Sequence, residues 1–354
     1  MHRKSDNYRD HGCMKRRDFL KISGMFGLGL ATFPAGIRSA EAVKFDKNLY
    51  KVSRSKPGMG TIVSITTLNP SKDHAEKSIA LAFEEIERLT KIMSRFDSDS
   101  PVALLNRDGF YNNVPPELSF VLQKSLQYHQ TSNGFFDITV KPVVDLLAQS
   151  YKDQKDIIQC KEKIAELLHL VNAKLISLHG NTVSFKKDGM GITLDGIAKG
   201  FIVDKAVETL MKQGIKHALI NAGGDIRTIG DKGNNRPWKI AIEDPLKKKN
   251  YPAIVAITNR SIATSGNYEV FFDREKMFHH IVDPKTGLSP LVNASVSVQA
   301  PTAIEADALS TTLFTLDPVK GTRLINSIPS CQCLIITRNQ QKIKSNNWQS
   351  ITAS

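Results

Sequence analysis

Cysteine is scarce in this chain, and the few cysteines form no recognisable framework. The 354 residues contain Cys13, Cys160, Cys331 and Cys333. Because Cys13 lies in an N-terminal leader described below, an odd number remains, with one Cys-x-Cys pair and no second Cys/His pair at zinc-finger spacing. The sequence therefore excludes a disulfide framework and a zinc finger, and predicts buried thiols.

Long hydrophobic runs are also missing. Outside the leader no segment reaches the roughly 18 consecutive apolar residues of a membrane-spanning helix. The apolar content of 41% and the charged content of 23% are those of an ordinary globular protein, so extensive disorder is not expected. We predict a folded protein that is not itself transmembrane.

The formal charge of +13 comes without a basic stripe interleaved with aromatic residues. Residues 1–42 hold eight Lys/Arg and four Asp/Glu, a net of +4, which leaves +9 for the rest. We therefore predict no nucleic-acid partner. A basic surface suits a polyanionic small ligand or an acidic partner.

The first 42 residues have the layout of an export signal. Arg16-Arg17 precedes a moderately apolar run over 22–35, and Ala40-Glu41-Ala42 fits a small-x-small cleavage site. The pattern resembles a twin-arginine signal, a route that by this resemblance carries folded proteins. It predicts a signal peptide over 1–42 and a periplasmic domain over 43–354, long enough for two lobes. A short basic anchor helix is the alternative.

Hydrophobic periodicity predicts helices and strands without regular βαβ alternation. Helices are expected over residues 73–93, with Asp73 as the N-cap, and over 116–133, 151–176, 201–213 and 303–314. Strands are expected over residues 59–68, 217–221, 239–242, 253–258, 295–299 and 333–337. The expected fold class is α+β, with mixed, largely antiparallel sheets flanked by helices.

Asp307 and Thr311 stand four residues apart on one of these helices. A carboxylate and a hydroxyl at this spacing share one face, so both could bind one hard cation. The competing explanation is that Thr311 bonds back to the carbonyl of the preceding turn. Upstream, His279-His280 and an Asp283-Pro284 turn would place acid/base groups beside such a cation, as phosphoryl or nucleotidyl transfer requires. Histidines hydrogen-bonded in a core are the alternative.

Glycine-rich segments could bring backbone close to a ligand. Residues 189–200 read Gly-Met-Gly-Ile-Thr-Leu-Asp-Gly-Ile-Ala-Lys-Gly before a predicted helix, whose free N–H groups could attract a phosphate. The segment is not a P-loop, because Lys199 is not followed by Ser or Thr. Gly223-Gly224 ends a strand, and Ser265-Gly266 could offer a hydroxyl to a phosphate. A turn or a connecting loop would explain each segment as well.

In this order, the segments resemble the FAD:protein FMN transferases, the ApbE or flavin transferase family. The resemblance covers roughly residues 57–325. It is carried by Met59-Gly60-Thr61, Gly134-Phe135-Phe136-Asp137 and the segments 194–200, 221–225, 263–266, 280–287 and 306–311. The chain departs from the usual pattern at Pro101, where the family has Glu, and at Asn267, where it has Asp.

The resemblance implies an ApbE-like fold and transfer of the FMN half of FAD to a Thr or Ser hydroxyl of another protein, with Mg²⁺ required and AMP released. The partner would be a redox protein with an FMN-binding domain and a motif resembling Asp-x-x-Ser/Thr-Gly-Ala-Ser/Thr. Asp307, Thr311 and the backbone carbonyl of Gly196 would hold the metal, and His280 would be the catalytic residue. The residues expected to contact FAD are Met59, Phe135, Phe136, Asp137, Thr193, Lys199 and Val282.

Three other functions stay open at this point. An FAD pyrophosphatase would use the same site with water as the nucleophile, giving FMN and AMP. A non-enzymatic FAD-binding assembly protein would carry the flavin without reacting. A two-lobed solute-binding protein fits export but explains neither the Asp307/Thr311 pair nor the glycines.

Overall fold

The computed structural model describes residues 41–45, 48–153, 160–246, 251–266 and 281–350. All but the last two residues of the predicted leader lie outside these ranges, as do His279 and His280. The boundary predicted after residue 42 falls inside the first described strand, β1 (Glu41–Lys44). Every helix in the described part is too short or too polar to cross a membrane.

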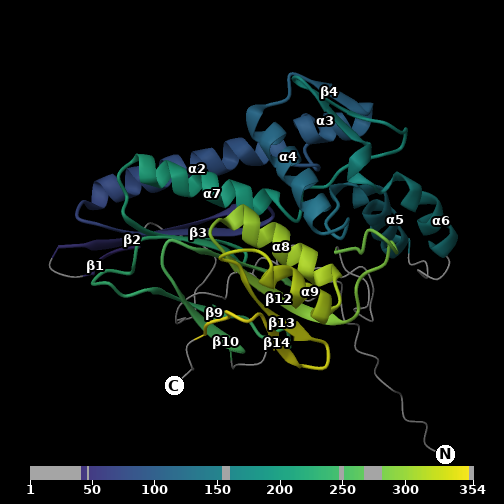
Figure 1. The fold of residues 1–354 in the computed structure, drawn as a ribbon. Coiled ribbons are helices and arrows are strands. Elements are labelled where there is room, and N and C mark those ends of the chain that lie inside the picture. Colours follow the sequence, from purple (N-terminus) through teal and green to yellow (C-terminus); the bar gives the residue numbers. More distant parts are fainter. Residues whose placement is uncertain (1–40, 46–47, 154–159, 247–250, 267–280, 351–354) are drawn as a thin grey trace, which may run out of the picture.

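An antiparallel sheet of nine strands is the centre of the molecule (Figure 1). Its order is β1-β2-β3-β7-β8-β11-β12-β13-β14, and each neighbouring pair is antiparallel. After β1 its strands are β2 (Tyr50–Gly58), β3 (Thr61–Asn69), β7 (His217–Ala222), β8 (Asp225–Ile229), β11 (Ser261–Gly266), β12 (Asn293–Ala300), β13 (Gln332–Thr337) and β14 (Lys342–Lys344). Two smaller antiparallel sheets comprise β9 (Trp238–Ile242) with β10 (Ala253–Ile257), and β4 (Phe110–Asn112), β6 (Thr182–Phe185) and β5 (Ile176–His179).

The helices cover one face of the large sheet and gather at one end of it (Figure 1). They are α2 (Lys72–Met93), α3 (Pro101–Asp108), α4 (Pro116–Thr131), α5 (Lys141–Lys152), α6 (Lys161–Leu167), α7 (Ala198–Lys212), α8 (Ala303–Thr315) and α9 (Pro318–Asn326). Helices α2 and α7 pack together, α7 contacts α8, and α8 lies on β11 and β12. The expected α+β class with antiparallel sheets is confirmed.

The middle strands of the large sheet pack against a core on each face, and their apolar residues point to both faces. In β3, Val63 and Ile65 belong to the core beneath α2 and α7, whereas Leu68 packs in a second core with Trp238 and Val255 of the small β9–β10 sheet. Successive strand residues point to opposite faces, so positions two apart share a face and positions three apart do not.

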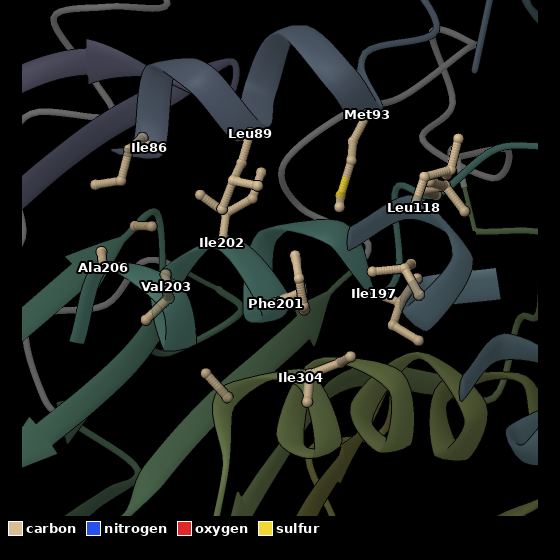
Figure 2. Close-up of a cluster of buried hydrophobic side chains, with 14 of the residues drawn as sticks. Ile86, Leu89, Met93, Leu118, Ile197, Phe201, Ile202, Val203, Ala206 and Ile304 are labelled. Carbon is tan, nitrogen blue, oxygen red and sulfur yellow. The ribbon is translucent and has the colours of Figure 1, made fainter. Parts of the chain in front are cut away.

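Helix α7 is fixed between α2 and α8 by large apolar side chains (Figure 2). Leu89 of α2 points toward α7, where Ile202 lies, and Ile304 of α8 lies on the other side of α7, all within one buried cluster that includes Phe201. Phe201 is 1% exposed, and burial of a side chain of this size is worth about 1.5–3 kcal/mol. This packing sets the position of the loop before α7 relative to α8.

The N-cap predicted at Asp73 is wrong. Helix α2 begins at Lys72, and Ser71 is its N-cap, because the Ser71 hydroxyl accepts a hydrogen bond from the His74 N–H at 3.2 Å. Asp73 instead lies in the first turn, where a negative charge is favourable to the helix dipole.

The single helix predicted over 151–176 is also wrong. Helix α5 ends at Lys152, α6 covers Lys161–Leu167, and 3₁₀ turns over Leu168–Leu170 and Ala173–Leu175 lead into β5. The Asn172 side chain accepts from the Lys174 N–H, which favours a turn, and the Ala173 N–H donates to the distant Asp137 carboxylate. Tertiary contacts thus override the helical spacing.

Two further boundaries differ from the prediction. The strand expected over 59–68 begins at Thr61, because Met59 and Gly60, with φ values of 52° and 73°, form the turn between β2 and β3. Helix α7 begins three residues before Phe201. The other predicted elements are confirmed within a few residues: α4, α8, β7, β9, β10, β12 and β13.

The prediction of buried thiols is confirmed. Cys160, Cys331 and Cys333 are free and buried. Burial raises the pKa of both Cys331 and Cys333 to about 12, so these two thiols are protonated at neutral pH.

Candidate active site

A pocket forms where the loop before α7, one face of α8 and the ends of several segments meet. Its other lining residues come from the segment 135–140, the first residue of β8, the end of β11, the segment 281–284 and Lys199 of α7. The lining residues are Phe135, Phe136, Asp137, Ile138, Val140, Thr193, Asp195, Gly196, Lys199, Asp225, Thr264, Ser265, Gly266, Ile281, Val282, Pro284, Asp307, Thr311 and Thr315.

Most of the residues singled out by the resemblance come together here. Those that line the pocket are Phe135, Phe136, Asp137, Thr193, Gly196, Lys199, Val282, Asp307 and Thr311. Met59 is not among the lining residues; it lies in the β2–β3 turn, partly buried against the main core. His280 lies outside the described residues, and its neighbour Ile281 lines the pocket. The chemical roles of these residues stay predictions.

Asp307 presents a buried carboxylate to the pocket from α8, with 4% of the residue exposed. Its Oδ2 accepts a hydrogen bond from the Gly200 N–H at 2.9 Å. This N–H belongs to the helix start that the sequence suggested for a phosphate. Burial raises the pKa of Asp307 well above its ordinary value, and the nearby Asp225 carboxylate raises it further, against the effect of Lys199. A cation bound here would relieve this unfavourable charge.

Thr311 lies one turn further along α8, against Gly196. A Cβ atom at position 196 would stand 2.8 Å from Thr311 Oγ1, so glycine is needed for the backbone at position 196 to lie this close to the Thr311 side chain. The backbone carbonyl of Asp307 accepts a hydrogen bond from the Ser310 hydroxyl at 3.0 Å, while Thr311 Oγ1 lies 3.3 Å from Ser265 Oγ. The structure therefore disfavours the explanation that Thr311 merely bonds back to its own helix.

Lys199 and Asp225 form an ion pair at the pocket wall. The Lys199 Nζ lies 3.0 Å from the Asp225 Oδ2, and the Asp225 side chain is 3% exposed while that of Lys199 is 31% exposed. The buried carboxylate thus holds the more exposed ammonium group at the pocket. A positive charge in this position suits a phosphate-bearing ligand.

Asp137 lines the pocket, but its carboxylate is used to shape the chain. It accepts hydrogen bonds from the Thr139 N–H at 2.8 Å and from the Ala173 N–H at 3.0 Å, and lies 3.0 Å from His129 Nδ1. Asp137 therefore fixes the segment 135–140, which contributes the aromatic wall of Phe135 and Phe136.

The N-terminus of α8 is anchored by a residue that sequence analysis missed. Asp204 of α7 accepts hydrogen bonds from the N–H groups of Ala303 and Ile304 at 2.8 and 2.9 Å and pairs with Arg227 of β8. Thr302, the N-cap residue, makes no side-chain cap. A buried carboxylate distant in sequence thus satisfies the helix N–H groups. No local signal could have revealed it.

A turn from Asp283 to Gly287 follows the pocket residues Ile281 and Val282. The Asp283 carbonyl accepts from the Gly287 N–H at 2.8 Å, and the Asp283 side chain accepts from the Lys285 N–H at 2.8 Å. The Lys285 ammonium lies 3.8 Å from the centre of the Phe135 ring. The Asp-Pro motif therefore shapes the rim of the pocket.

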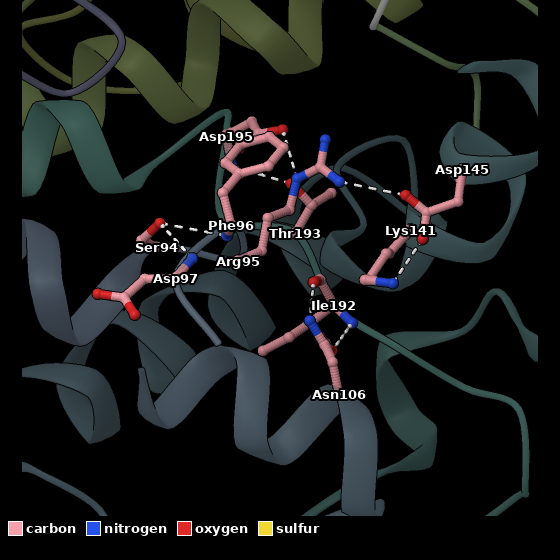
Figure 3. A network of polar contacts seen from close by, with 10 residues as sticks. All are labelled: Ser94, Arg95, Phe96, Asp97, Asn106, Lys141, Asp145, Ile192, Thr193 and Asp195. Carbon is pink, nitrogen blue, oxygen red and sulfur yellow. Dashed lines mark hydrogen bonds and ion pairs between the residues drawn. The ribbon is translucent and has the colours of Figure 1, made fainter. Parts of the chain in front are cut away.

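A second rim structure surrounds Arg95, which the sequence did not point to (Figure 3). The Arg95 guanidinium lies 3.2 Å from the Asp195 carboxylate and 3.1 Å from that of Asp145, and stacks 4.4 Å from the Phe96 ring centre. It ties the loop after α2 to the loop before α7. In the same region, Pro101 is the first residue of α3, a position that favours proline.

Comparisons with known proteins identify a family for the whole chain. The ApbE family model matches residues 59–335. The FAD:protein FMN transferase of Haemophilus influenzae is 30% identical over 316 residues, covering 85% of this chain and 88% of that protein. That of Vibrio cholerae is 28% identical over 293 residues, covering 80% and 87%.

Solved structures have the same fold. The ApbE protein of Thermotoga maritima superposes with a TM-score of 0.74 at 27% identity, covering 84% of this chain and 97% of that one. The flavin transferase ApbE of Vibrio cholerae gives a TM-score of 0.73 at 25% identity, covering 84% and 98%. Since the family model matches residues 59–335 and these relatives align over most of their length, this chain belongs to the ApbE family.

Proposed function

We propose that this protein transfers the FMN half of FAD to a Ser or Thr hydroxyl of an acceptor protein and releases AMP. The observation that supports this most directly is the convergence of Asp307, Thr311 and Gly196 beside the cationic Lys199 in one pocket. The related proteins with the same fold are named FAD:protein FMN transferases or flavin transferases.

The residues present fit a magnesium ion. The carboxylate of Asp307, the hydroxyl of Thr311 and the carbonyl of Gly196 are the hard oxygen donors that Mg²⁺ prefers. Within the described ranges no group of three or more His, Cys, Asp and Glu side chains is placed to hold a metal, so the proposed site depends on hydroxyl and carbonyl donors beside one carboxylate. When bound, such an ion would neutralise charge on the pyrophosphate of FAD.

The protein's own groups would bind and orient the two reactants. Lys199, held by Asp225, would pair with a phosphate oxygen, and the apolar side chains of Phe135, Phe136 and Val282 would pack on the flavin nucleotide. The acceptor oxygen would then attack the phosphorus of the FMN half. A new P–O bond forms, the bond from that phosphorus to the bridging oxygen breaks, and AMP leaves with the bridging oxygen.

The acceptor hydroxyl must lose its proton, and His280 is our candidate base. Replacing His280 by Ala is expected to leave FAD binding unchanged and to slow transfer by the about 10²- to 10⁴-fold that a general base contributes. Flavin fluorescence would measure FAD binding, and covalent flavin on the acceptor would measure transfer. A His279→Ala variant made in parallel would show which histidine has the role. Near-normal turnover of His280→Ala would remove this residue from the mechanism.

Incubation with FAD and Mg²⁺ tests the proposed reaction against its alternatives. We expect AMP to form only when a protein carrying the acceptor motif is present, together with flavin bound covalently to that protein. An acceptor whose Ser or Thr is replaced by Ala is the control. Rapid AMP formation without acceptor would instead indicate an FAD pyrophosphatase. Flavin binding that does not depend on Mg²⁺, with no AMP formed, would indicate an FAD-binding assembly protein.

We also propose export to the periplasm by the twin-arginine route, which Arg16-Arg17 and the following apolar run support. Fractionation of cells that express the full chain would test this. Periplasmic accumulation that is lost when both arginines are replaced by Lys is the expected result. Equal export of the two forms would exclude this route.

A further inference from the structure

We propose that Ser265 is a positioning residue that turns the Thr311 hydroxyl so that its lone pairs face the metal site. Ser265 is near the end of β11 and lines the pocket. Its Oγ lies 2.9 Å from Ser310 Oγ and 3.3 Å from Thr311 Oγ1. The inference rests on the proposed function, because it concerns the hydroxyl that we assign to Mg²⁺.

The direction of these hydrogen bonds follows from counting protons. Each hydroxyl can donate only one hydrogen, and a backbone carbonyl can only accept. Ser310 donates its hydrogen to the Asp307 carbonyl at 3.0 Å. Ser310 must therefore be the acceptor in its contact with Ser265.

The same count then gives the direction of the hydrogen bond between Thr311 and Ser265. Since Ser265 gives its one hydrogen to Ser310, it can only accept in its contact with Thr311. The Thr311 hydroxyl is thus the donor, and its hydrogen points to Ser265. Both lone pairs of Thr311 Oγ1 are left for a cation, which is what a neutral hydroxyl ligand must offer. We call the chain from Thr311 through Ser265 and Ser310 to the Asp307 carbonyl the hydroxyl relay.

The hydroxyl relay also connects α8, which carries Asp307 and Thr311, to the large sheet. Ser265 is paired with Val296 in the β11–β12 ladder, and the neighbouring Thr264 hydroxyl bonds Ser297 of β12 at 2.8 Å. The acceptor for the Thr311 hydrogen therefore belongs to a paired strand of the large sheet and not to α8 itself. Partners of metal ligands that are held in this way typically change metal affinity by about 10- to 100-fold when removed.

Binding of Mn²⁺ by the full-length protein in the presence of FAD, without acceptor, tests the relay. Electron paramagnetic resonance of free Mn²⁺ would measure the affinity. We expect Ser265→Ala to bind Mn²⁺ about tenfold or more weakly than the unaltered protein, because Thr311 loses the acceptor that orients its hydrogen. Ser265→Thr retains a hydroxyl and is expected to restore most of the affinity.

Thr312→Val is the matched control, because Thr312 is also on α8, is 1% exposed and donates to the Ala308 carbonyl at 2.7 Å. Its removal tests the loss of a buried hydroxyl outside the relay, and we expect unchanged Mn²⁺ affinity. Equal affinity of Ser265→Ala and the unaltered protein would overturn the relay alone, as would an equal loss in Thr312→Val. Failure of the unaltered protein to bind Mn²⁺ would overturn the metal site of the proposed function, and the relay with it.

Discussion

Replacing Asp307 by Asn is expected to lower the rate of FMN transfer by about a thousandfold or more, because a metal ion contributes several kcal/mol to such a reaction. Asp307 supplies the only carboxylate among the three proposed ligands. An amide is a much weaker ligand for Mg²⁺ than a carboxylate. Covalent flavin on the acceptor, followed over time at saturating FAD, would measure the loss.

The same substitution should not weaken the metal-free fold. Burial and the Asp225 carboxylate raise the pKa of Asp307, so its ionised form is unfavourable in the folded protein near neutral pH. The Asn side chain carries no charge, and its oxygen can still accept from the Gly200 N–H. We expect the thermal midpoint without metal to stay level or rise. A clear fall in this midpoint, or normal transfer, would contradict the assigned role.

Replacing Gly200 by Ala is expected to destabilise the protein by about 3 kcal/mol or more, at the upper end of the range for overpacked sites. The added Cβ would stand 2.3 Å from the Ala303 carbonyl oxygen and 2.8 Å from the Asp307 Cβ. Backbone on α8 cannot move as a flexible side chain can, so α7 and α8 must separate. The free energy of unfolding from urea titration would measure the effect.

Gly321→Ala is the matched control, because Gly321 is also a buried helical glycine, in α9. A Cβ there would meet nothing closer than Ile335 Cδ1 at 3.5 Å, which is ordinary contact distance. Alanine favours a helix over glycine by up to about 1 kcal/mol, so this variant should be as stable as the unaltered protein or more so. Similar stability of the two alanine variants would show that the α7–α8 contact is looser than we infer.

Periodic segments with clear ends could be predicted from the sequence. Helix α4 and strands β7, β12 and β13 have apolar spacings that match their period, and Gly214 ends α7 with a φ of 76°. Prediction failed where a side chain changed the local preference. Ser71 caps α2 in place of Asp73, and the segment 151–176 breaks where Asn172 and Asp137 bond its backbone.

The candidate site was predicted in part. The pair Asp307 and Thr311 was visible because a four-residue spacing puts two side chains on one helix face. The link from Arg95 to Asp195 and the anchoring of α8 by Asp204 were not visible, since each joins residues about a hundred positions apart. The roles of Met59 and His280, like those of the residues that line the pocket, stay predictions.

The sequence by itself determined which chemical groups this protein possesses and the family pattern in which they are ordered. It determined this because periodicity, turns and short motifs depend on near neighbours in the chain. Only the tertiary structure decided that Asp307 lies beside Asp225, and that the Ser265 and Thr311 hydroxyls lie 3.3 Å apart. Burial, charge proximity and the direction of a hydroxyl hydrogen depend on segments brought together by packing, and no local pattern encodes them.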